Sequence, residues 1–217
     1  MAIKFNRAAR TLLFLFILYC SYLLILLSLP YIHFEKNVEF LATKQLIYHL
    51  DWWRWSFYIH VFSSPIVILT GLFQFNRNFI HRRKKVHRIL GIIYFLFVVL
   101  ISGPSALLMG LYANGGYLAQ ISFVLLSTLW IFSTAFAFLS AKKRDYLKHS
   151  RWMLHSYALT LSAVTLRVYA YCFDYFNIHL GPKETYILLS YLSWIPNLIL
   201  AEIIIRSKFL QGLNQSD

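Results

Sequence analysis

Long apolar runs, separated by short polar and basic segments, repeat along the whole chain. Each run is close to the roughly 20 residues that a helix needs to cross a hydrocarbon core. Lipid offers the backbone no hydrogen-bond partner, so continuous apolar runs of this length have to be helical. The pattern predicts an all-α, polytopic membrane protein: a single-domain bundle of six transmembrane helices. The predicted spans are residues 11–29, 55–75, 88–111, 118–141, 152–174 and 185–205.

Composition supports a membrane protein. Hydrophobic residues make up 59% of the 217 residues and charged residues 13%, against roughly 45–50% and about 25% in soluble domains. The first run could instead be a secretory signal peptide, but it is longer than the usual apolar core of about 7–15 residues. No cleavage site of the A-x-A kind follows it before Pro30. We therefore expect residues 11–29 to stay in the membrane.

Lysine and arginine concentrate in the amino-terminal segment, in the loops 76–88 and 142–151, and in the tail. Basic residues are retained on the cytoplasmic side, so both termini are predicted to be cytoplasmic, in a plasma (inner) membrane. Residues 30–54 then form an extracytoplasmic loop. The net charge of +13 reflects this topology and favours anionic lipid over nucleic acid as a partner.

The sequence lacks the motifs of several common enzyme classes. Cys20 and Cys172 lie in different spans and form no CxxC pair, which argues against a disulfide framework or a zinc site. No glycine-rich phosphate loop, HExxH or GxSxG motif is found. Residues that bind a cofactor or a substrate must therefore be sought among the polar side chains at or within the predicted spans.

Two histidines could ligate a haem. His87 and His149 are expected at the cytoplasmic starts of the third and fifth spans, and paired neutral imidazoles in a bundle core suit a low-spin haem iron. Gly91 lies one turn deeper on the face of His87 and would leave room for the macrocycle. Arg151 could receive a propionate; further candidates are Arg82, Arg83 and Lys148. The alternative is that these histidines simply lie at the headgroup boundary.

Three further polar residues are candidates for substrate binding. His60 shares a helix face with Gly71 and Gln74. Arg167 lies inside the fifth span, where an arginine costs roughly 2.5–3.5 kcal/mol and should face protein or water. One alternative pairs Arg167 with Asp174 on the same face. The other assigns His60, Gln74 and Arg167 to a ligand site.

The string "HSRWMLHSYALTLSAVTLR" from His149, "HRILGIIY" from His87 and the spacing from His60 to Phe75 resemble a bacterial family of predicted membrane proteins, a domain of unknown function. The resemblance covers roughly residues 60–171. The positions that match the family's recurring polar residues are His60, Gln74, His87, Arg88, His149, Trp152 and Arg167. The family usually has arginine where this chain has Ser150 and His155, which argues against His155 as an essential ligand.

A more distant resemblance is to six-helix transmembrane cytochromes b of the ascorbate-reducing and ferric-reductase type. This resemblance rests on helix count and histidine placement and concerns the fold, and the fourth span lacks the histidine that a second haem would need. Because His87 and His149 are expected at matched depth, we expect a membrane oxidoreductase with one haem b, exchanging electrons with a quinone or a metal chelate. One alternative is a binding or transport protein in which Arg167 and His60 line an outward-facing cavity. Another is a membrane subunit without a ligand.

Overall fold

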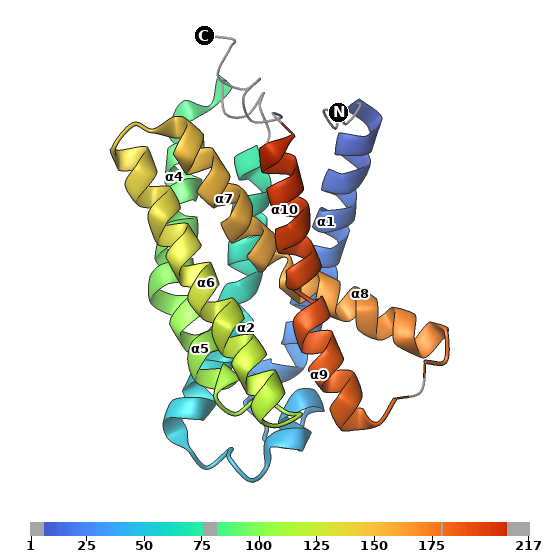
Figure 1. The fold of residues 1–217 in the computed structure, drawn as a ribbon. Coiled ribbons are helices and arrows are strands. Elements are labelled where there is room, and N and C mark those ends of the chain that lie inside the picture. The colour runs from blue at the N-terminus through green and yellow to red at the C-terminus, as the bar shows by residue number, and fades with distance from the viewer. Residues whose placement is uncertain (1–6, 76–81, 179, 208–217) are drawn as a thin grey trace.

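The computed structural model describes residues 7–75, 82–178 and 180–207, and all regular secondary structure in these ranges is helical. This confirms the all-α prediction. The elements are α1 (Arg7–Ser28), α2 (Asp51–Leu72), α4 (Lys84–Leu96), the π-helical turn η4 (Phe97–Ser102), α5 (Gly103–Gly110), α6 (Tyr117–Lys142), α7 (Tyr146–Thr160), α8 (Ser162–Tyr175), α9 (Pro182–Leu192) and α10 (Ile195–Arg206). The helix α1 begins, and α10 ends, at the same end of the bundle (Figure 1).

Five stretches of the described residues are long and apolar enough to cross a membrane. They correspond to five of the six predicted spans, with boundaries shifted by a few residues. These stretches are Thr11–His33, Asp51–Phe75, Lys84–Gly110, Tyr117–Lys142 and Pro182–Arg206. The protein is thus a membrane protein with several apolar helices, whose surroundings are a lipid bilayer.

The prediction of one continuous helix over residues 152–174 is wrong. The helix α7 begins earlier, at Tyr146, and ends at Thr160, while α8 leaves the bundle obliquely after Leu161 (Figure 1). With 15 residues, α7 is only about 22 Å long, shorter than the hydrocarbon core of about 30 Å. No proline or glycine marks this break. A side chain from another helix stabilises it instead, because Asn197 Nδ2 donates to the Ala158 carbonyl at 3.1 Å.

A second break separates α9 from α10 at Ser193 and Trp194. Pro196 in the first turn of α10 has no N–H to continue the hydrogen-bond ladder. Asn197 Nδ2 also donates to the Ser193 carbonyl at 3.0 Å, and Trp194 Nε1 donates to Ser122 Oγ at 3.0 Å. Asn197 therefore joins both helix breaks.

The third departure from α-helical geometry is η4, just before Pro104. The missing N–H of Pro104 removes one donor from the ladder, and a turn with i→i+5 bonds accommodates the loss. Gly103 permits the close approach, since a Cβ there would collide with the Val98 carbonyl. Turns of this kind often occur at functional sites.

The predicted loop 30–54 is compactly folded and ends before Asp51, where α2 begins. Its two short 3₁₀ helices, η1 (Leu29–His33) and η2 (Glu39–Lys44), pack on the first turns of α2. A buried apolar cluster holds them there: Tyr31, Leu41, Trp53, Phe57 and Tyr58. The loop thereby forms one wall of the interior described next.

Candidate functional site

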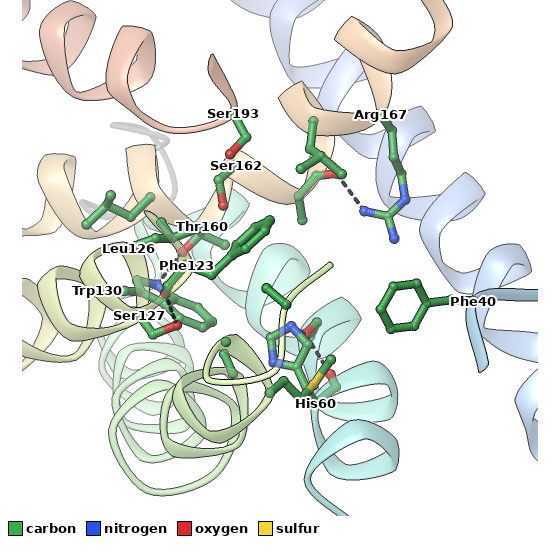
Figure 2. Close-up of a pocket in the computed structure, with 18 of the residues that line it drawn as sticks. Phe40, His60, Phe123, Leu126, Ser127, Trp130, Thr160, Ser162, Arg167 and Ser193 are labelled. Atoms are coloured by element: carbon green, nitrogen blue, oxygen red, sulfur yellow. Dashed lines mark hydrogen bonds between the residues drawn. The ribbon is translucent and has the colours of Figure 1, made fainter. Parts of the chain in front are cut away.

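A cavity of about 200 Å³ lies where the α7–α8 and α9–α10 breaks meet the folded loop. Its lining includes Ser162 beside the α7–α8 break and Ser193 at the α9–α10 break. Figure 2 shows Arg167 from α8 and His60 from α2 approaching this space, with Phe40 on one side and Trp130 on the other. A water needs roughly 10–15 Å³, so the cavity has room for several waters or a small molecule.

The walls are apolar, with polar groups at a few points. Aromatic rings come from Phe40, Trp53, Phe123, Trp130 and Tyr186. The polar lining residues are Lys44, His60, Ser64, Ser127, Thr160, Ser162, Arg167 and Ser193. Two of these side chains are cationic, and none of the lining residues is an aspartate or glutamate. Apolar walls with a few placed polar groups are typical of small-molecule sites.

Arg167 makes a single local hydrogen bond, from Nη1 to the Ala163 carbonyl one turn earlier at 2.7 Å. Asp174, the partner considered from the sequence, is exposed and forms no ion pair with it in the described part of the chain. A guanidinium has five N–H donors. Most of its donor capacity is therefore available to a ligand or to water.

Lys44 is a cavity residue that the sequence analysis missed. It is only 4% exposed, and its Nζ donates to the Tyr112 carbonyl at 2.5 Å. The ammonium also lies 5.4 Å from the centre of the Phe40 ring and 6.0 Å from that of Trp53. Burial lowers the pKa of Lys44 to about 8. A lysine in a loop is normally solvated, and no local signal marks this one as buried.

His60 is held by the π-helical turn. Its Nδ1 lies 3.0 Å from the Ser102 carbonyl, which can only accept, so Nδ1 carries the proton. Ser64 Oγ lies 3.2 Å from Nε2 and 2.6 Å from the carbonyl of His60 itself. The single hydroxyl proton goes to the closer carbonyl. The Nε2 lone pair of neutral His60 therefore remains available to a ligand donor.

Thr160 connects the cavity to a buried network of hydroxyl groups. Tyr94 Oη lies 2.7 Å from Thr160 Oγ1 and 2.8 Å from Ser156 Oγ. Trp130 Nε1 donates to Thr160 at 2.9 Å, and Thr134 Oγ1 lies 2.6 Å from Ser156. These groups satisfy one another and join α4, α6 and α7.

His87 and His149 lie in the first turns of α4 and α7, at the other end of the bundle. His149 Nδ1 donates to the Ala137 carbonyl at 2.9 Å, which leaves Nε2 free, as in many metal-binding histidines. His87 Nδ1 is buried and has no partner in the described structure. The two rings are close enough for their charges to interact.

The space expected beside Gly91 holds the Gln74 side chain. A Cβ on Gly91 would lie 3.5 Å from Gln74 Oε1, and Gln74 Nε2 donates to the His87 carbonyl at 3.4 Å. Gln74 does not line the cavity of His60 and Arg167. Each imidazole thus has a nitrogen without a partner among the described residues, whereas Gln74 occupies the space beside Gly91 that a macrocycle would need. The pairing of His87 and His149 on one iron stays a prediction.

Arg151, the expected propionate partner, lines a second cavity between α7 and α10. Its Nε is buried and has no partner in the described structure. His155 and Glu202 also line this cavity, with His155 Nε2 lying 3.3 Å from Glu202 Oε2.

Comparison with known proteins gave one family match. Residues 57–205 match a family described as predicted membrane protein, DUF2306. No curated protein and no solved structure matched. The matched residues run from α2 to α10 and include every residue that lines the two cavities except Phe40, Lys44 and Trp53.

Proposed function

This chain belongs to the DUF2306 family of predicted membrane proteins, and we propose that it binds a small amphipathic anion inside its helix bundle, as a binding or transport protein. The observation that carries this proposal is the charge of the cavity. Lys44 and Arg167 both line it, while none of its lining residues is acidic. Lys44 is buried, whereas Arg167 is exposed and borders the cavity from α8. Cations that line an apolar cavity without carboxylates favour an anion that supplies the missing charge.

Other residues that line the cavity add a hydrogen-bond acceptor and apolar contacts for a ligand. The Nε2 lone pair of His60 accepts a hydroxyl or N–H, and the aromatic walls pack against an apolar body. The helix α8 also begins at the cavity, with Ser162 in its first turn. The partial positive charge of a helix start favours an anion there. A compact carboxylate with a flat apolar group, such as benzoate, matches the aromatic walls and the helix start.

The helix breaks favour movement of a ligand as well as binding. Solute transporters place their sites near the middle of the membrane, between discontinuous helices whose ends face the substrate. Irregular backbone at this depth is tolerated where it lines a cavity. Here the α7–α8 and α9–α10 breaks both border the same cavity.

Thermal protection of the purified protein tests the proposal. Benzoate should raise the melting temperature, whereas benzamide, of the same shape but uncharged, should raise it much less. In Arg167→Ala the benzoate affinity should fall roughly tenfold, as for the loss of a charged hydrogen bond. Arg82→Ala is the matched control, because Arg82 is exposed and lies outside the cavity.

Equal protection by benzoate and benzamide would contradict an anion site. So would an identical response of Arg167→Ala and Arg82→Ala. Uptake of radiolabelled benzoate into vesicles that contain the protein then distinguishes transport from binding alone.

A second candidate is the haem b protein expected from the sequence, acting as an oxidoreductase towards a quinone or a metal chelate. The unpartnered Nδ1 of His87 and the fixed tautomer of His149 support it. When bound, the haem would supply one-electron redox chemistry, and His87 and His149 would hold its iron. The test is a reduced-minus-oxidised difference spectrum of purified protein, with His87→Ala and His149→Ala as variants. A colourless preparation that takes up no added haem would contradict a haem b function.

We further propose that the protein lies in the plasma membrane with both termini cytoplasmic. The distribution of lysine and arginine supports this orientation. Single cysteines introduced at Glu35 and at Lys143 test it with a membrane-impermeant thiol reagent, in a background without Cys20 and Cys172. Only the cysteine at position 35 should react from outside the cell.

A further inference from the structure

A second cavity, of about 440 Å³, lies between the start of α7 and the end of α10. Four of its residues, Lys148, Arg151, Trp152 and His155, follow one face of α7 at spacings of three and four. Glu202 comes from the facing helix α10. This cavity shares no lining residue with the cavity at His60 and Arg167.

In this cavity Arg151 has a hydrogen-bond donor that lacks an acceptor in the described structure. Its Nε is buried, and no hydrogen-bond partner is found for it in the part of the chain that the structure describes. A buried donor without an acceptor is unfavourable, so the site lacks an acceptor atom. The planar guanidinium fits two oxygens of a phosphate at once. Lys148 adds a second cation one turn away.

The two carboxylates that line the cavity are already engaged. Asp145 Oδ1 caps the start of α7 by accepting from the backbone N–H of Lys148 at 3.0 Å. Glu202 accepts from Arg206 Nε at 2.6 Å and contacts His155 Nε2 at 3.3 Å. Neither forms an ion pair with Arg151 within the described residues. The charge of Arg151 therefore remains available to an external anion.

His155 and Trp152 line the same cavity. The Nδ1 of His155 is buried and without a partner in the described structure, while its Nε2 faces Glu202. Trp152 packs beside this ring, with the two centres 5.8 Å apart. An amphipathic aromatic ring of this kind is typical of the headgroup level of a membrane.

We infer that this cavity binds a phosphate group, contributed by a lipid headgroup or by a free phosphate, with Arg151 as its main ligand and Lys148 and His155 beside it. The inference does not depend on the ligand proposed for the other cavity. Arg167→Ala should therefore leave it intact.

The experiment uses the purified full-length chain in an uncharged detergent and measures binding by thermal shift. Three probes separate the sources: dioctanoyl phosphatidylglycerol, dioctanoylglycerol without a phosphate, and inorganic phosphate. Arg151→Gln should weaken phosphatidylglycerol binding roughly tenfold. Arg82→Gln, which removes one exposed arginine outside the cavity, is the matched control and should change it less than about twofold.

Binding of phosphatidylglycerol that inorganic phosphate cannot replace would support a headgroup, and equal binding of inorganic phosphate would support a free phosphate. Equal binding of dioctanoylglycerol would overturn the inference, as would equal losses in the two variants. If Arg151→Gln fails to fold, Arg151→Lys replaces it. That variant keeps the charge and loses the planar fork, so unchanged affinity would also overturn the assignment.

Discussion

Two polar regions lie next to each other in the same apolar bundle and meet at Thr160. In the hydroxyl network, Tyr94, Ser156 and Thr134 pair with one another and with Thr160 at 2.6 to 2.8 Å. In the cavity, by contrast, the Arg167 and Lys44 side chains donate only to backbone carbonyls in the described structure.

This difference distinguishes polar groups that stabilise the fold from polar groups that are available to a ligand. A network whose members satisfy one another stabilises a unique packing. Charged groups with unused donors in an apolar interior stabilise little by themselves and indicate a ligand. Substitutions in the two regions should therefore have opposite profiles, with large effects on folding in the network and on binding in the cavity.

The largest expected effect is at the close contact beneath the network. A Cβ on Gly71 would collide with the Tyr157 ring and lie 2.9 Å from Tyr94 Cε2. Gly71→Ala should lower the free energy of unfolding by about 1–3 kcal/mol, because both buried rings must shift. Gly91→Ala is the matched control, since its Cβ meets Gln74 at an ordinary 3.5 Å and alanine favours the helix. Denaturant unfolding of both variants would measure the difference; equal stabilities would contradict the packing.

The second-largest effect on the free energy of unfolding is expected within the hydroxyl network. Tyr94→Phe removes the oxygen that contacts both Ser156 and Thr160, which keep only their contacts with Thr134 and Trp130 among the network side chains. The loss should be about 1–2 kcal/mol, as for a buried hydrogen bond. Tyr22→Phe, on the exposed face of α1, should be neutral. If Tyr94→Phe were as stable as Tyr22→Phe, the network would contribute nothing to folding.

The second region, the cavity, is tested by the pH dependence of protein stability that Lys44 causes. Its pKa is about 8 in the folded protein and an ordinary 10.5 in the unfolded chain. Between these values the unfolded state binds more protons, so stability rises with pH from about 8 to about 10.5. The melting temperature should rise across this window relative to Lys44→Met, by about 2–4 °C for each kcal/mol gained. Benzoate binding should weaken over the same window, because Lys44 loses its charge; parallel profiles of the two proteins would contradict a buried lysine.

The smallest effect on folding is expected at Arg167. Its one side-chain hydrogen bond is to a carbonyl on its own helix, so Arg167→Leu should change the free energy of unfolding by no more than about 0.5 kcal/mol. The same variant should lose benzoate protection. A large loss of stability would instead show that Arg167 stabilises the fold, as the residues of the hydroxyl network do.

The amino-acid pattern was sufficient to predict the fold class and five stretches that are long and apolar enough to cross a membrane. The physical reason is local: lipid forces every long apolar run to satisfy its own backbone, so length and hydropathy are sufficient. It also singled out His60 and Arg167 as unusual, because polar groups in such runs are costly wherever they occur.

The partners of those residues depend on how the helices pack. The break after Thr160 carries no proline or glycine, and its free carbonyl is satisfied by Asn197 from another helix. Lys44 looks like a solvated loop residue until the loop folds onto α2 and buries it. Gln74 rather than open space lies beside Gly91. In each case the partner is distant in the chain, and no local pattern encodes contacts that arise only when helices pack.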